Sequence, residues 1–250
     1  MNSKDTQKPS LTLSNMETGL SNKIFFISDS AATIDFGNVI DEEINKRVIS
    51  LFNYIILHPP EGMIEAIPAY SSLSVYFDIG LLRKKIQPQE KVYEWISEAL
   101  HRLMHNDFAI TQTEKNLIRI PVCYDEEYGI DMRWISDKKS ISIQEIIQLH
   151  SSKQYRVYML GFLPGFAYMG EVEERIAVPR KPQPQMISAG SVGIAGRQTG
   201  IYPLNSPGGW QIIGRTPLKM FDKDKNELCL LKAGDYVEFY PITKDEFKSY

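Results

Sequence analysis

The sequence has little cysteine and no long apolar run. Its 250 residues include two cysteines, Cys123 and Cys229, and neither has a partner at the spacing of a zinc site. We therefore expect free thiols in a reducing cytoplasm rather than a disulfide scaffold. A membrane-spanning helix needs about 18 consecutive apolar residues, and no such stretch occurs. Residues 1–22 also lack the apolar centre of a signal peptide and are predicted to form a disordered tail.

The sequence also lacks an excess of either charge. Its 28 Lys and Arg residues against 31 Asp and Glu residues give a formal net charge of −3. This balance argues against a general nucleic-acid binder and against a polybasic membrane anchor. Acidic residues are nevertheless missing from one segment: residues 182–221 contain no Asp or Glu, whereas Arg197, Arg215 and Lys219 remain. Any site that depends on charge is therefore expected to be local.

Length and pattern predict two domains. A chain of 250 residues accommodates one large or two modest domains. Residues 23–112 read as strand, strand, helix, strand, strand, helix, with Asp41 capping the first helix and the second helix beginning near Pro88. Both helices carry an apolar stripe. This predicts an α+β domain in which they pack on one face of a small mixed sheet, as a ferredoxin-like layer.

The pattern changes in the second predicted domain, residues 113–250. A strand at 116–124 and a helix at 141–150 come first, and this helix is the last that the pattern predicts. His150, at its end, is interpreted by default as a structural cap whose positive charge suits the helix dipole, with a role in a site as the alternative. Short apolar runs separated by turn residues follow, which predicts a β-barrel or a β-sandwich.

Glycine and proline gather in one stretch of the second domain. Residues 161–217 hold ten of the 16 glycines and seven of the 14 prolines. Strand corners account for about half of them. Because the same stretch lacks acidic residues, we expect an anion site there, built from backbone N–H groups in glycine turns, guanidinium groups and polar side chains. Trp210 follows two glycines and is expected either to line this pocket or to fill the core.

Spacing excludes three familiar kinds of site. Glycines 190, 193 and 196 recur every third residue without a following Lys-Ser or Lys-Thr, so this is not a P-loop. The AGSVG run at 189–193 departs from the nucleophile elbow and no histidine follows it, which argues against a serine hydrolase. His101 and His105 lie one helical turn apart, but no metalloprotease glutamate or third ligand accompanies them, so no metal site is expected.

Long motifs resemble one known family. The runs YRVYMLGFLPGFAYMG (155–170) and VPRKPQPQMISAGSVGIAGRQTGIYPLNSPGGWQIIGRTPLKMFD (178–222) are similar to the family of the kinase A inhibitor, which also includes allophanate hydrolase subunit 1 and the B-type subunit of 5-oxoprolinase. The similarity continues in SIQEIIQLH (142–150), IPVCY (120–124) and IPAYSSLSVYFD (67–78). It therefore covers nearly the whole chain after the first 22 residues.

The resemblance implies a fold and a function. The fold is a small α+β domain followed by a cyclophilin-like β-barrel, without any implication of prolyl isomerase activity. The function is that of a subunit, inactive alone, of an ATP-dependent 5-oxoprolinase that opens 5-oxoproline to glutamate together with A-type and C-type subunits. ATP, with its accompanying Mg²⁺, is the expected cofactor, and the resemblance leaves open whether it contacts this chain or its partner.

The family motifs also give the candidate site residues. They bind substrate or another anion, and the catalytic acid and base stay unassigned. The candidates are Pro164, Gly165, Phe166, Gln198, Thr199, Tyr202, Ser206, Gly208, Gly209, Trp210 and Arg215.

Two other functions remain open at this point. Some members of the family resemble an inhibitor that binds a sensor histidine kinase and blocks its autophosphorylation. In that case Phe162, Phe166, Tyr168 and Trp210 would anchor a protein interface. The lesser alternative is the carboxyltransferase half of a urea carboxylase and allophanate hydrolase system, which the sequence favours less because it contains no biotin-carrier segment.

Overall fold

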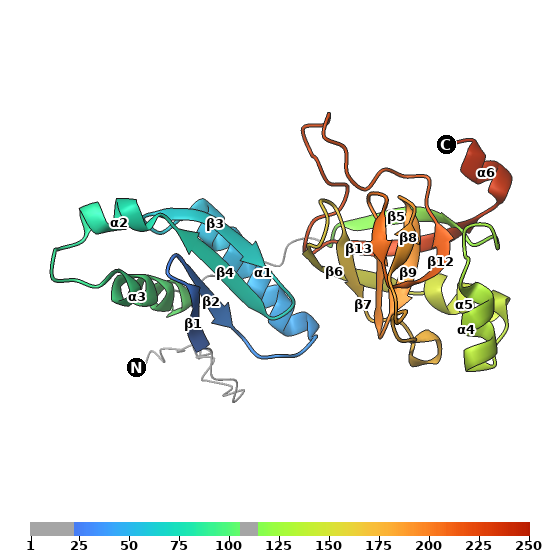
Figure 1. Ribbon diagram of the computed structural model, residues 1–250, viewed down its shortest axis with the longest axis horizontal. Coiled ribbons are helices and arrows are strands. Elements are labelled where there is room, and N and C mark those ends of the chain that lie inside the picture. The colour runs from blue at the N-terminus through green and yellow to red at the C-terminus, as the bar shows by residue number, and fades with distance from the viewer. Residues whose placement is uncertain (1–22, 106–114) are drawn as a thin grey trace, which may run out of the picture.

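A computed structural model describes residues 23–105 and 115–250 (Figure 1). An α+β part comes first and a barrel follows, so the predicted fold class is confirmed. The predicted disordered tail at 1–22 lies outside the described residues, and so does the predicted domain boundary between residues 112 and 113.

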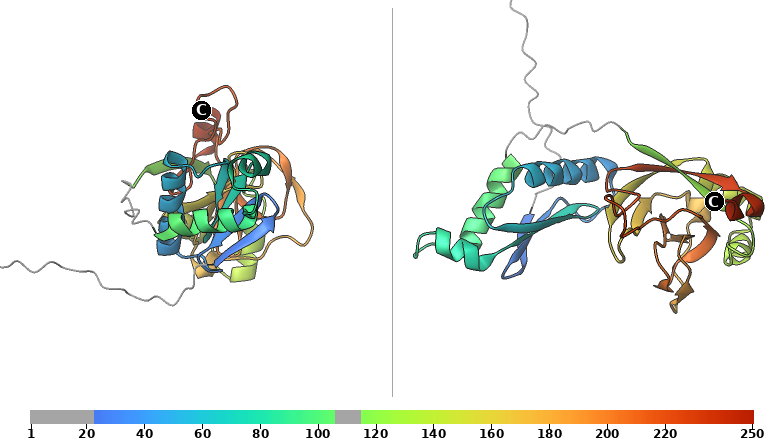
Figure 2. Two further views of the ribbon diagram at one scale, coloured as in Figure 1. Left: turned by 90° about the vertical axis from the view of Figure 1, so that its left-hand side faces the viewer. Right: turned by 90° about the horizontal axis from the view of Figure 1, so that it is seen from above.

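The α+β part is a four-stranded sheet with helices on one face. Its elements are β1 (Lys23–Ser28), β2 (Ala31–Asp35), α1 (Glu42–Leu57), β3 (Met63–Pro68), β4 (Ser72–Phe77), α2 (Ile79–Lys85) and α3 (Val92–His105). The strand order is β1-β2-β4-β3, and α1 and α3 cover the face that β2 and β4 turn toward the core (Figure 2). Both predicted helices and all four predicted strands are present.

Two details of this part differ from the sequence expectation. Every strand pair is antiparallel, so the sheet is not mixed. Two of the three pairs, β1-β2 and β3-β4, are hairpins, whose strands are antiparallel. The remaining pair, β2-β4, is antiparallel as well. The short helix α2 was not predicted; it begins where the Asp78 side chain accepts a hydrogen bond from Leu81 N at 2.9 Å.

Helix α1 forms for the reasons that its sequence gives. The Asp41 side chain accepts a hydrogen bond from Ile44 N at 2.8 Å and so satisfies a free donor of the first turn. Val48, Leu51 and Ile55 are fully buried against the sheet, as their helical spacing predicts.

The second part is a closed barrel. Its elements are β5 (Leu117–Cys123), α4 (Met132–Lys139), α5 (Ile143–Ser151), β6 (Gln154–Leu160), β7 (Ala167–Gly170), η1 (Glu174–Ile176), β8 (Gln185–Ile187), β9 (Ser191–Ala195), β10 (Gln198–Ile201), β11 (Ser206–Gly208), β12 (Gln211–Arg215), β13 (Tyr236–Ile242) and α6 (Lys244–Lys248). The barrel order is β10-β7-β6-β13-β5-β12-β9, and the separate pair β8-β11 lies outside this ring. Only β5 and β13 are parallel among these described pairs.

This part contains more helices than the sequence predicted. Helix α5 was predicted, but α4 precedes it, and α6 follows at the C-terminal end. The expectation that 141–150 holds the last helix is therefore wrong. Helix α6 is held by a capping box between Thr243 and Glu246. With five residues, it is too short to show the apolar repeat on which the prediction relied.

Two features noted in the sequence, the cysteines and the lack of a long apolar run, can be compared with the structure. Cys123 and Cys229 are free cysteines, as predicted. Within residues 23–105 and 115–250, no helix combines the length and the apolar character needed to cross a membrane.

A buried amide joins the two parts. Asn45 on α1 is fully buried, and its amide nitrogen donates to the carbonyl oxygens of Ala69, Tyr70 and Tyr158 at 3.2, 3.1 and 3.1 Å. Its oxygen accepts a hydrogen bond from Arg156 Nε at 2.9 Å. Because Tyr158 and Arg156 belong to β6, one side chain fixes α1 against the barrel and partners a buried guanidinium.

We predict that Asn45→Ala lowers the free energy of unfolding by about 2–4 kcal/mol, because it removes the buried partner of Arg156 Nε and the amide donor shared by three carbonyl groups. Urea titration followed by circular dichroism measures the change. Asn53→Ala, on an exposed position of the same helix, is the matched control and should change it by less than about 0.5 kcal/mol. Equal effects of the two variants would contradict the assigned role of Asn45.

His150 lies in the barrel core and is not a charged cap. It is fully buried and stacks on Phe239 at a ring-centroid distance of 4.6 Å. Tyr124 Oη lies 2.8 Å from its Nδ1 and Thr199 Oγ1 lies 2.9 Å from its Nε2. Since Thr199 donates to Gly193 O, it accepts from Nε2–H, and the Tyr124 hydroxyl donates to Nδ1.

Burial lowers the pKa of His150 from 6.5 to about 3, so the ring is neutral. The sequence interpretation of His150 as a positively charged helix cap is therefore wrong. The helix periodicity could not show this, because the aromatic and hydroxyl partners come from outside the helix: Tyr124 follows β5, Thr199 lies on β10 and Phe239 lies on β13.

We predict that His150 makes the protein less stable in mild acid. In the unfolded chain the ring takes up a proton near pH 6.5, whereas in the native state it stays neutral down to about pH 3. The unfolded state therefore binds more protons below pH 6.5, which costs about 2 kcal/mol of stability at pH 5.

Urea titrations at pH 7 and pH 5 test this, and His150→Gln should show the smaller loss because it cannot titrate. The wild-type ring should also show no NMR titration between pH 8 and pH 5. A ring that titrates near pH 6.5 would refute the prediction.

Candidate functional site

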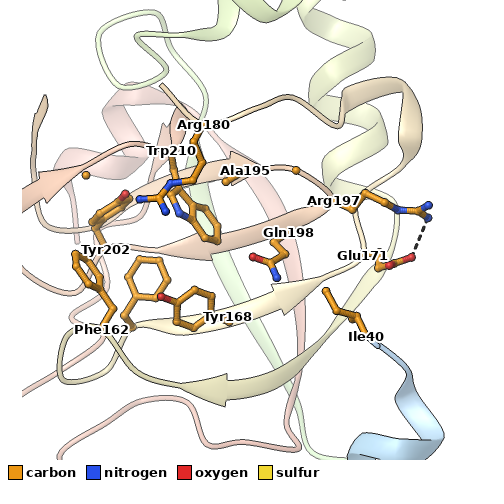
Figure 3. A pocket seen from close by; sticks show the side chains of 13 residues that line it. Ile40, Phe162, Tyr168, Glu171, Arg180, Ala195, Arg197, Gln198, Tyr202 and Trp210 are labelled. Carbon is orange, nitrogen blue, oxygen red and sulfur yellow. Dashed lines mark ion pairs between the residues drawn. The ribbon is translucent and has the colours of Figure 1, made fainter. Parts of the chain in front are cut away.

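A pocket opens on the barrel face that carries the glycine-rich stretch. Its volume is about 570 Å³. Its lining comes from loop 161–166, from β7, β9, β10 and β11, and from the residues that flank these strands. Ile40, just before α1, reaches it from the other part of the molecule (Figure 3). The lining residues are Ile40, Phe162, Phe166, Tyr168, Glu171, Arg180, Ala195, Gly196, Arg197, Gln198, Tyr202, Gly208 and Trp210.

Four aromatic rings form one wall of the pocket. Phe166 meets Trp210 and Tyr202 edge to face, with centroid distances of 5.4 and 5.2 Å, and Tyr168 meets Trp210 at 5.9 Å. Phe166, Tyr202 and Trp210 are buried, so their positions are fixed by the packing beneath them. Trp210 thus both lines the pocket and fills the core. Such a wall can contact the face of a small flat ring.

The turn before Phe166 gives the wall its shape. Gly165 has φ of +83°, and a Cβ there would lie 2.9 Å from Met220 O, so only glycine fits. Phe162 adopts φ of +68°, a conformation that non-glycine residues rarely adopt, and its side chain is 61% exposed at the pocket rim. The ring of Phe162 meets that of Phe166 edge to face at 5.6 Å.

Glycine at position 208 lets two elements approach closely. A Cβ on Gly208 would lie 2.3 Å from the Tyr202 hydroxyl oxygen. Tyr202 is fully buried and cannot retreat without disturbing the aromatic wall. This glycine is therefore required by packing rather than by its backbone dihedral angles.

The two arginines of the pocket have different surroundings. Arg197 forms ion pairs with Glu171 at 2.8 Å and with Glu174 at 3.5 Å. Arg180 forms no ion pair and no side-chain hydrogen bond with any residue that the structure describes, and in Figure 3 its guanidinium group reaches between Tyr202 and Trp210. The carboxylate of the lining is thus neutralised, and Arg180 is a cation without a counter-ion among the described residues.

The pocket tyrosines are neutral donors. Burial raises the pKa of both Tyr168 and Tyr202, and the positive charge of Arg180 offsets part of each rise. Both hydroxyl groups stay protonated at neutral pH and can donate hydrogen bonds to a ligand.

The structure brings together part of the predicted site. Phe166, Gln198, Tyr202, Gly208 and Trp210 line the pocket. Pro164 and Gly165 belong to the turn that positions Phe166, and Gly209 packs against the guanidinium of Arg180.

Six of the eleven predicted residues are therefore not part of the lining: Pro164, Gly165 and Gly209, which adjoin it, and Thr199, Ser206 and Arg215. Thr199 is fully buried, and its hydroxyl faces His150 in the barrel core. Arg215 donates from Nε to Ala189 O at 2.8 Å. Ser206 is buried on β11, and its hydroxyl has no hydrogen-bond partner among the described residues. Along a strand neighbouring side chains face opposite sides, so Gln198 and Thr199 cannot both face the pocket.

Sequence reasoning missed Arg180 and Ile40. Arg180 lies just before the acid-free segment, inside the motif that begins at Val178, so the motif was a usable signal. Ile40 lies outside every motif that pointed to the barrel, and only the packing of the two parts brings it to the pocket.

Metal ligands do not gather in the described parts of the chain. Within residues 23–105 and 115–250 no three His, Cys, Asp or Glu side chains form a group that could hold a metal ion. The polar side-chain groups of the pocket lining are instead guanidinium, amide, phenol and indole groups and one paired carboxylate.

Known proteins resemble this chain over most of its length. The family model for the carboxyltransferase domain, subdomain C and D, matches residues 22–231. The B-type subunit of 5-oxoprolinase from Bacillus subtilis (strain 168) is 41% identical over 230 residues, which cover 90% of this chain and 94% of that protein.

Solved structures share the fold. The crystal structure of TTHA0988 superposes with a TM-score of 0.71 at 33% identity and covers 85% of this chain. This chain spans 40% of the length of TTHA0988. The conserved uncharacterized protein PH0987 from Pyrococcus horikoshii is 43% identical, with a TM-score of 0.52 and coverage of 90% of this chain and 100% of that one. The resemblance seen in the motifs is confirmed: this chain belongs to the carboxyltransferase subdomain C and D family, together with the B-type subunits of 5-oxoprolinase.

Proposed function

We propose that this chain is the B-type subunit of an ATP-dependent 5-oxoprolinase and acts with subunits of types A and C to open 5-oxoproline to glutamate. The observation that carries this proposal is the 41% identity with the Bacillus subtilis protein over nearly the full length of both chains. The family model matches residues 22–231, a range that contains every residue lining the pocket.

The pocket chemistry supports a ring-shaped, anionic substrate. 5-Oxoproline is a five-membered lactam that carries one carboxylate. The aromatic wall offers a surface for the ring, and Arg180 offers an unpaired positive charge. Of the residues that motif matching selected, Phe166, Gln198, Tyr202, Gly208 and Trp210 are in place to contact such a ligand.

The pocket supports binding better than independent catalysis. Hydrolysis of an amide needs a base or nucleophile at the carbonyl carbon. Glu171, the carboxylate of the lining, is held by Arg197, and no histidine, cysteine or serine of the described chain lines the pocket. We therefore assign the chain a non-autonomous role, in which partner subunits complete the catalytic site.

ATP supplies what the lactam lacks. A lactam is a stabilised amide, and phosphorylation of its carbonyl oxygen would activate it and drive ring opening. The pocket itself does not fit a nucleoside triphosphate, because Arg180 is the one cation of the described lining without a carboxylate partner. In our proposal ATP, with Mg²⁺, is bound by a partner subunit or at the junction with it.

Reconstitution tests the proposed function. The chain alone should release no glutamate from 5-oxoproline, whereas the chain with its A-type and C-type partners and ATP should release it in proportion to ATP consumed. The matched control contains the same partners and ATP but omits this chain. Glutamate release by the chain alone, or the same rate with and without it, would overturn the proposal.

A glycine substitution tests whether the pocket serves the reaction. Gly208→Ala should lower kcat/KM for 5-oxoproline by at least about tenfold, because the new methyl group displaces Tyr202 from the wall. Gly80→Ala is the control, since its Cβ would meet nothing closer than 3.3 Å and lies in the α+β part. Full activity of Gly208→Ala in a correctly folded assembly would separate the pocket from the reaction.

A further inference from the structure

We infer that Arg180 is the carboxylate anchor of the pocket, and that the pocket takes a small flat ring carrying a single carboxylate. The identity of that ring as 5-oxoproline rests on the proposed function, whereas the class of ligand rests on the geometry around Arg180.

The first argument is the charge left over in the pocket. The charged lining residues are Arg180, Arg197 and Glu171, which sum to a formal charge of +1. Arg197 pairs with Glu171 and Glu174, so Arg180 is the cation of the lining that has no carboxylate partner among the described residues. One unpaired guanidinium matches one carboxylate, with which it can form two parallel hydrogen bonds.

The second argument is that the backbone around Arg180 is held in place. Gln211 is buried and its side chain donates to Pro179 O at 3.1 Å, while Lys181 N donates to Gly209 O at 2.6 Å. On the preceding side, Gly196 N donates to Val178 O at 2.7 Å. The residues on both sides of Arg180 are thus fixed to the barrel, while its own side chain has no partner among the described residues.

A nearly buried ion pair strengthens the same support. Lys181 Nζ lies 2.7 Å from Asp131 Oδ2, and their side chains are 9% and 16% exposed. Asp131 Oδ2 also accepts a hydrogen bond from Ile212 N on β12. Asp131 therefore neutralises Lys181 and leaves the neighbouring guanidinium free. The backbone at Arg180 is thus fixed before a ligand binds, and binding has to order only the side chain.

The third argument is the space around the guanidinium. A Cβ on Gly209 would lie 3.4 Å from Arg180 Nε and 3.6 Å from one terminal nitrogen, so glycine leaves this flank of the guanidinium uncovered. Its positive charge acts on the hydroxyl groups of both Tyr168 and Tyr202. The cation therefore stands at the edge of the aromatic wall, where a carboxylate would lie if the attached ring rested on that wall.

Gln198 completes the recognition of the ring. Its side chain lines the pocket and makes no hydrogen bond to any residue within the described ranges. A side-chain amide both donates and accepts, as a lactam does, so the two can pair. A ring with one amide and one carboxylate would use both of these polar groups, Gln198 and Arg180.

Equilibrium binding to the full assembly without ATP tests the inference. Isothermal titration calorimetry compares 5-oxoproline with 2-pyrrolidinone, the same lactam without a carboxylate. Arg180→Gln should weaken 5-oxoproline binding by about 10- to 100-fold, the range for losing a charge-assisted pair, and should leave 2-pyrrolidinone binding unchanged. Arg180→Lys should fall between Arg180→Gln and wild type.

The matched control is Arg133→Gln, which removes an exposed arginine of α4 that pairs with Glu126. It should leave both affinities unchanged. Thermal denaturation should show the same melting temperature for all three variants, because Arg180 and Arg133 are exposed.

The outcomes separate the inference from the proposed function. The inference would be overturned if Arg180→Gln left 5-oxoproline binding unchanged, weakened the binding of both ligands equally, or raised only the KM for ATP. It would also be overturned if the wild-type assembly did not bind 5-oxoproline. Arg180-dependent 5-oxoproline binding in an assembly that releases no glutamate would uphold the inference and contradict the proposed function. Glutamate release that does not depend on Arg180 would uphold the proposed function and contradict the inference.

Discussion

The arrangement of the molecule depends on the buried contact between Asn45 and Arg156. A guanidinium removed from water must have its donors satisfied. Arg156 achieves this with Asn45 from α1 and with Tyr236 from β13, whose hydroxyl donates in turn to Glu42. This network fixes the start of α1 on the barrel. Ile40 lies just before that helix, so the same contact also positions Ile40 at the pocket.

Local charge in the pocket is set by pairing rather than by composition. The acid-free segment predicted a surface that suits an anion, but two of its cations are already engaged: Arg197 with Glu171, and Arg215 with a backbone carbonyl. The free cation, Arg180, lies outside the segment, and Asp131 leaves it free by pairing with Lys181. Counting charges along a sequence cannot show which of them are neutralised across strands.

The sequence predicted those features that depend on neighbouring residues. The capped start of α1, the buried stripe of α1 and the strands of the barrel follow from local periodicity and turn residues. Family motifs also located the aromatic wall. What could not be predicted depends on contacts between distant segments. His150 ends a helix in the sequence, yet Tyr124 and Thr199 enclose it in the barrel core. Thr199 was assigned to the site because the family motif contains it, and the motif does not show that its hydroxyl faces His150.

The same residues are the reason that we propose binding without independent catalysis for this pocket. Its aromatic rings and its glycines at 165 and 208 are fixed by packing, which gives a rigid surface for a ring. Its tyrosines are held protonated by burial, which raises their pKa, and its one carboxylate is paired with an arginine. Groups that bind by donating hydrogen bonds are poor bases. Under the proposed function, a base and a phosphoryl donor would therefore come from outside the lining, which is the physical reason that we propose a reaction shared among subunits.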